Sequence, residues 1–73
     1  MSSTTTDSAG EALRKLRNIA GLRIEDVARE ANVSAAQLSR VENGAAQPRP
    51  RWVAAVTTAI AEALQQQAAQ KAA

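Results

Sequence analysis

Apolar residues at three- and four-residue spacing recur along most of this 73-residue chain, and glycine or asparagine interrupts the pattern three times. The interruptions are Gly21, Asn32 and the pair Asn43-Gly44. Apolar spacing of this kind predicts amphipathic helices, and both residue types tolerate the left-handed backbone that ends a helix. No stretch of the chain has the alternating apolar pattern that predicts a strand. The sequence therefore predicts an all-α fold of short helices joined by tight turns.

The first predicted helix covers about residues 9–20 and ends at Gly21. Ser8, with Glu11 three residues later, forms the capping-box pattern that begins many helices. The inner face is predicted to consist of apolar residues at helical spacing: Ala12, Leu13, Leu16, Ile19 and Ala20. Residues 1–7 are rich in Ser and Thr, which predicts a disordered N-terminal arm.

The second predicted helix covers residues 24–31 and ends at Asn32, where we expect a tight turn. Its first turn is acidic, which favours the helix dipole. The residues predicted to face inward are Val27, Ala28 and Ala31. Ala28 is small, and this allows the next helix to cross closely at that point.

The third predicted helix covers residues 35–42. Ser34 is its N-cap and Gln37 completes a capping box, while Val33 can pack on Leu38 as a hydrophobic staple. This arrangement leaves an outer face of small residues and one arginine: Ala35, Ala36, Ser39, Arg40 and Asn43.

The fourth predicted helix begins near Pro50, a residue suited to a first helical turn. Its inner stripe is predicted to be Val53, Val56, Ile60 and Leu64. Residues 65–73 are rich in Gln and Ala and either prolong this helix or fray. The folded domain is therefore expected to cover residues 8–64, with residues 65–73 as a helical extension or tail.

Positive charge is concentrated in the middle of the chain, although the formal net charge is only +2. Residues 10–51 hold eight Arg and Lys against five Asp and Glu, which gives that segment a charge of +3. Seven of the eight cations are arginines, whose forked guanidinium suits phosphate and guanine. Taken by itself, this charge distribution is explained equally well by phosphate binding and by an ordinary solvated surface.

The residue types that are missing exclude several classes of function. The chain has no Cys and no His, so disulfides and thiolate metal sites are excluded, and acid–base chemistry is left to Glu, Asp and Lys. No apolar run approaches the roughly 18 residues of a membrane span, and the N-terminus does not resemble a secretory signal. We therefore expect a small cytoplasmic binding protein without enzymatic activity, cofactor, metal, small-molecule substrate or membrane contact.

The helix–turn–helix pattern carries a specific resemblance. The segments "LRKLRNIAGL" and "VAREANVSAAQLSRVENG", followed by Pro48 four residues after Gly44, are similar to the lambda-repressor/Cro-type (XRE-like) helix-turn-helix family. The resemblance covers about residues 12–60 with many residues at fixed spacing. It implies a compact domain of four to five helices, with the third helix in the DNA major groove.

The resemblance also implies roles for individual residues. The positions that contact bases are Ala35, Ala36, Ser39 and Arg40. The positions near the DNA phosphates are Arg23, Ser34, Asn43, Arg49 and Arg51. Arg17 and Glu42 correspond to a structural ion pair that ties the first helix to the end of the third. Arg40 can form two hydrogen bonds with guanine, and an alanine methyl can pack on a thymine methyl.

Two departures from the family pattern limit what can be carried over. Arg23 and Ile24 stand where relatives usually have a Ser or Thr cap and a phosphate-binding Gln, so we expect the cap to be lost and Arg23 to replace the Gln contact. The chain also continues past the fourth helix without the break that precedes a fifth helix in many relatives. Trp52, the single aromatic residue, is expected either in the core or in a dimer contact.

Together these features predict a sequence-specific regulator of transcription, of the repressor type, that binds double-stranded DNA as a homodimer on an inverted repeat. The alternative is an antitoxin-like or accessory protein of the same fold that acts mainly through a protein partner, with the Gln/Ala-rich tail as the contact.

Overall fold

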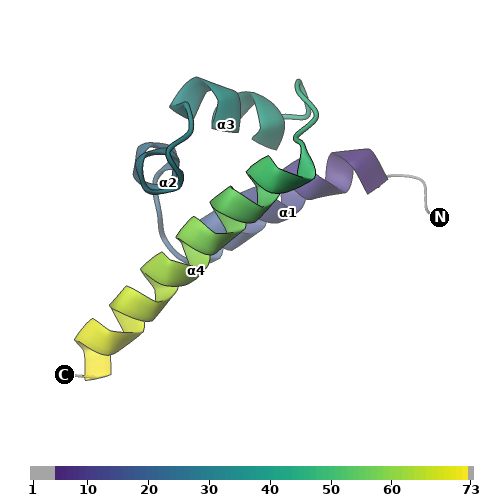
Figure 1. Ribbon diagram of the computed structural model, residues 1–73. Helices are drawn as coiled ribbons and strands as arrows, with labels where there is room; N and C mark the ends of the chain where they lie inside the picture. Colours follow the sequence, from purple (N-terminus) through teal and green to yellow (C-terminus); the bar gives the residue numbers. More distant parts are fainter. Residues whose placement is uncertain (1–4, 73) are drawn as a thin grey trace.

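The computed structural model describes the backbone of residues 5–72 and the side chains of residues 9–70. This part of the chain contains four helices and no strand: α1 (Thr5–Ile19), α2 (Ile24–Ala31), α3 (Ala35–Glu42) and α4 (Pro50–Ala72). The long helices α1 and α4 pack on each other, and the short helices α2 and α3 lie together on one side of them (Figure 1). The predicted all-α architecture is confirmed.

Helix α1 begins earlier than the sequence indicated. It starts at Thr5, so residues 5–7 of the predicted arm are helical and Ser8 lies inside the helix. The predicted capping box of Ser8 and Glu11 is therefore wrong as a helix start, and residues 1–4 of the predicted arm lie outside the described residues. The physical reason is that a capping pattern is a local preference worth about 1 kcal/mol, which does not prevent a helix from starting earlier.

Helices α1, α2 and α3 end with the same hydrogen-bond pattern. Gly21, Asn32 and Gly44 have positive φ angles of 70°, 59° and 78°. Each donates its backbone N–H to the carbonyl three residues back, at 3.0, 3.2 and 3.1 Å. The following residue donates to the carbonyl five residues back, as Val33 does to Ala28 at 2.9 Å. This is the Schellman motif, and it confirms that the predicted left-handed residues end the helices.

The core lies where the four helices meet and consists of aliphatic side chains: Leu13, Ala20, Val27, Ala28, Leu38, Val41, Val56, Ala59 and Ile60. Leu38 and Val56 are fully buried, at 0% exposure. Ala28 is 3% exposed, as expected for the small residue at the close crossing of α2 and α3. Trp52 is half-buried and packs against the core, which is the first of its two predicted places.

Three large apolar residues that were predicted to face the core are exposed instead. Leu16 is 39% exposed, Ile19 78% and Leu64 38%, and Ala12 is exposed as well. In α1 the residues that face inward include Gly10, Leu13, Arg17 and Ala20, and this places Leu16 and Ile19 on a flank. Arg17, a polar residue, is half-buried on the inner face of α1, where apolar periodicity alone predicts its neighbour Leu16. On α4 the prediction omitted the buried Ala59.

Helix α4 continues through the Gln/Ala-rich segment to Ala72, so the segment prolongs the helix. The side-chain amide of Gln67 donates to the backbone carbonyl of Ala20 at 3.0 Å, which attaches this part of α4 to the end of α1. None of the helices in residues 5–72 combines the length and the apolar character needed to span a membrane.

Candidate nucleic-acid interface

The turn between α2 and α3 sets the direction of α3. Asn32 is left-handed, with φ 59° and ψ 44°, and Ser34 returns to an extended conformation with φ −75° and ψ 135°. The Ser34 hydroxyl oxygen accepts the backbone N–H of Gln37 at 3.1 Å, which makes Ser34 the N-cap of α3 as expected. Because Leu38 and Val41 anchor the inner side of α3, its opposite side is held toward solvent.

The outer face of α3 is centred on Ala36, Gln37 and Arg40, which are all exposed. Ala36 and Arg40 are one helical turn apart on the same face. Ala35 and Ser39 are half-buried, and Ala35 packs against the core. Gln37 was predicted only as part of the capping box of α3. Its position three residues before Arg40 is the signal that could have identified it as part of this surface.

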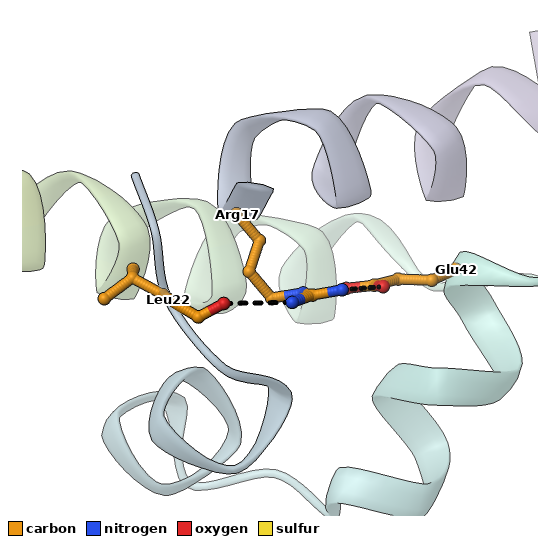
Figure 2. A network of polar contacts seen from close by, with 3 residues as sticks. All are labelled: Arg17, Leu22 and Glu42. Atoms are coloured by element: carbon orange, nitrogen blue, oxygen red, sulfur yellow. Dashed lines mark hydrogen bonds and ion pairs between the residues drawn. The ribbon is translucent and has the colours of Figure 1, made fainter. Parts of the chain in front are cut away.

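Arg17 and Glu42 form a bidentate ion pair between α1 and the end of α3. The Arg17 Nε and Nη2 atoms donate to the two carboxylate oxygens of Glu42, each at 2.8 Å. Arg17 Nη1 donates to the carbonyl of Leu22 at 2.9 Å, so the guanidinium lies between the loop after α1 and the end of α3 (Figure 2). The two side chains are 12% and 4% exposed. The hydrogen bond with Glu42 raises the pKa of Arg17 above its ordinary value.

A family model described as a helix-turn-helix domain matches residues 8–72 of the chain. The chain belongs to the helix-turn-helix domain family. No curated protein and no solved structure gives a significant match. In proteins built on this motif, the second helix of the motif lies in the major groove of DNA, and here that helix is α3.

Exposed polar residues of the helix-turn-helix domain lie at both ends of α3 and at the starts of α2 and α4. The five residues predicted to lie near phosphates are all exposed: Arg23, Ser34, Asn43, Arg49 and Arg51. Asn43 directly follows α3, and Arg49 and Arg51 are on either side of Pro50 at the start of α4.

Arg23 occupies the N-cap position of α2 and forms no side-chain cap hydrogen bond, which agrees with the expected loss of the cap. Acidic residues in the first turn of α2 complement the helix dipole in its place. Asp26 is one of them, and a hydrogen bond from Arg29 at 2.8 Å is the main cause of its lowered pKa. Because the Arg23 side chain makes no cap hydrogen bond among the described residues, its guanidinium is not needed to cap α2.

Gly10 positions the helix-turn-helix motif in a way that the sequence reasoning missed. It is buried in α1, and a Cβ atom built on it would overlap the carbonyl oxygen of Val41 and lie 3.4 Å from the Cα of Glu42. The backbone of α1 thus passes directly against the last turn of α3. A glycine inside a helical pattern costs about 1 kcal/mol relative to alanine, and that cost is the signal of a close approach.

Proposed function

We propose that this helix-turn-helix protein binds double-stranded DNA sequence-specifically and regulates transcription as a repressor, with α3 in the major groove. The observation that carries the proposal is the outer face of α3, where Ala36 and Arg40 lie one turn apart and both are exposed. The opposite side of the helix is anchored by Leu38, and its two ends are fixed by Ser34 and by the Arg17–Glu42 pair. A rigidly held helix with a small residue beside an arginine can approach base edges closely.

Arg40 is the residue to which we assign most of the base specificity. Its guanidinium can donate to O6 and N7 of one guanine, a pairing worth about 1–3 kcal/mol of discrimination. Ala35 and Ala36 offer methyl groups to thymine methyls, and Ser39 and Gln37 offer hydrogen-bonding groups to neighbouring positions. The half-buried Ala35 and Ser39 lie at the edges of this surface, so their contacts are expected to be fewer.

The exposed residues around α3 are assigned to the DNA backbone. Arg23, Arg49 and Arg51 provide charged contacts, and Ser34 and Asn43 provide neutral ones. Contacts of this kind fix the orientation of the protein on the duplex and carry little sequence information. A protein with these properties acts in the cytoplasm, on the nucleoid.

We propose that two copies bind an inverted repeat, because one such unit reads only a few base pairs. The half-sites are then about one helical turn, roughly 34 Å, apart. The exposed Leu16, Ile19 and Leu64 provide the contact between copies: Gln67 holds α4 beside the end of α1, and no charged residue occurs in residues 63–70 of α4. The segment of α4 after Ile60 is about 18 Å long, so the contact between the copies is expected to be small.

The test is selection from a random duplex pool at about 150 mM salt, followed by sequencing of the bound DNA. Enrichment of an inverted repeat supports both specific binding and a symmetric dimer. A single enriched half-site supports specific binding and contradicts the dimer. No enrichment contradicts the proposed function and favours an accessory protein of the same fold that acts through a protein partner.

A separate variant tests the proposed contact between the two copies. Ile19→Lys should weaken binding to the full repeat while leaving binding to an isolated half-site unchanged. Asn18→Lys places the same charge on the neighbouring exposed position and serves as the matched control. Equal behaviour of the two variants contradicts the assignment of this surface.

A further inference from the structure

A polar hollow lies where α1 passes the end of α3. Five residues line it: Glu11, Arg14, Glu42, Asn43 and Gly44. The close approach of Gly10 to Val41 brings the next turn of α1, with Arg14, beside the residues that end α3. Arg14 had no role in the sequence-based assignment of the DNA contacts.

The acidic residues at this hollow leave the Arg14 charge available. Both carboxylate oxygens of Glu42 accept hydrogen bonds from Arg17, and the Glu42 side chain is 4% exposed. Glu11 is exposed on the same helix, where a pair with Arg14 contributes little free energy in water. Among the residues whose side chains are described, Arg14 is in neither of the two salt bridges.

The donors that face a ligand in this hollow are side chains. The backbone N–H groups of Asn43, Gly44 and Ala45 are already bonded within the helix end, at 3.0, 3.1 and 2.8 Å. The groups that remain are the guanidinium of Arg14 and the side-chain amide of Asn43, both exposed. Gly44 has no side chain, and a Cβ built on it would meet nothing within 4 Å, so a ligand can approach the end of α3.

We propose that Arg14 and Asn43 together bind one phosphate of the DNA backbone. A planar guanidinium and a neutral amide suit the several oxygens of a phosphodiester, which accept charge-assisted hydrogen bonds. The inference rests on the proposed function, because Asn43 directly follows the helix assigned to the major groove, three residues after Arg40. It extends the DNA-facing surface from α3 onto α1.

The experiment measures the affinity for the selected duplex at several salt concentrations, with Arg14→Ala and the matched control Lys15→Ala. Both residues are exposed cations on α1, and only Arg14 lines the hollow. The magnitude of the slope of log K against log salt should fall by about 0.9 for Arg14→Ala, the value for one lost phosphate contact. Lys15→Ala should leave the slope unchanged, and Arg14→Lys should retain most of it.

A double-mutant measurement tests whether Arg14 and Asn43 contact the same phosphate. Asn43→Ala should weaken binding in the wild-type background and have a smaller effect in Arg14→Ala, because both act on one phosphate. Thermal unfolding of each variant separates these effects from loss of the fold. If the wild-type protein binds DNA and Arg14→Ala has the slope of Lys15→Ala, the inference is wrong and the proposed function stands. If the wild-type protein binds no duplex, both fail.

Discussion

Arg17 on α1 and Glu42 on α3 are 25 residues apart and share two hydrogen bonds of 2.8 Å. Arg17 also donates to the Leu22 carbonyl, so one guanidinium joins the end of α1, the following loop and the end of α3. Through this contact the orientation of the helix assigned to base contacts depends on a residue of α1.

Breaking this pair should destabilise the domain strongly. Glu42→Gln removes the charge that compensates Arg17, whose side chain is only 12% exposed. Removal of one partner of a fully buried pair costs about 3–5 kcal/mol, and this is the upper end of the loss expected for the part-buried pair. Urea unfolding followed by circular dichroism measures the change. Asp26→Asn, which breaks the exposed Asp26–Arg29 pair, is the control and should leave the unfolding midpoint nearly unchanged. Similar losses in both variants contradict a structural role for the Arg17–Glu42 pair.

The free energy of unfolding should be independent of pH between about 6 and 8. The raised pKa of Arg17 means that its stabilising contribution is complete below the ordinary Arg range and is lost only as the pH rises through the folded-state pKa. The lowered pKa of Asp26 means that its contribution is present above the ordinary Asp value of 3.8 and is lost as the pH falls through the folded-state pKa. The chain has no His to titrate between these limits. Denaturant unfolding at several pH values tests this, and a clear slope within the window would contradict it.

Arg40→Ala should reduce the affinity for the selected duplex by about 1–3 kcal/mol and relax the preference at one base pair. The reason is the loss of a two-bond contact with guanine. The measurement is a repeat of the duplex selection with the variant. If the variant instead weakens binding to every duplex equally, Arg40 contacts the backbone and the assignment of base specificity is wrong.

Arg51→Ala should weaken binding to all duplexes by a similar factor and reduce the magnitude of the salt slope by about 1, as expected for a phosphate contact. The same is expected of Arg49→Ala. Fluorescence anisotropy with the selected duplex and a scrambled one measures both quantities. Loss of affinity for the selected duplex alone would show that Arg51 acts in specificity.

Gly10→Ala should destabilise the domain although alanine is the better helix former. The added methyl overlaps the Val41 carbonyl, and overpacking of this kind costs about 1–3 kcal/mol. Asn18→Ala is the control, because position 18 is exposed on the same helix and alanine should be neutral or slightly favourable there. Thermal unfolding distinguishes the two. A Gly10→Ala variant as stable as the wild type would show that the contact between α1 and α3 relaxes without cost.

The most accurate sequence-based predictions concern features that depend on a few neighbouring residues. Helix α2 begins at Ile24 and α3 is capped by Ser34, as expected. Gly21, Asn32 and Gly44 adopt the left-handed backbone because the Cβ of most other residues makes it unfavourable. The Arg17–Glu42 pair followed from a family resemblance, since nothing local connects two residues so far apart.

Other features depend on how the helices pack. Apolar spacing does not reveal which of several neighbouring residues on α1 faces the other helices, so Ile19 was placed in the core although it is 78% exposed. The contact between Gly10 and Val41 likewise depends on where α3 crosses α1. The sequence by itself determined the bounds of α2 and α3, the turns that end the helices and the cap of α3, because those are set by local backbone sterics and hydrogen bonds. Only the tertiary structure decided the faces, the helix contacts and the hollow at Arg14, because those arise when distant segments compete for the same buried volume.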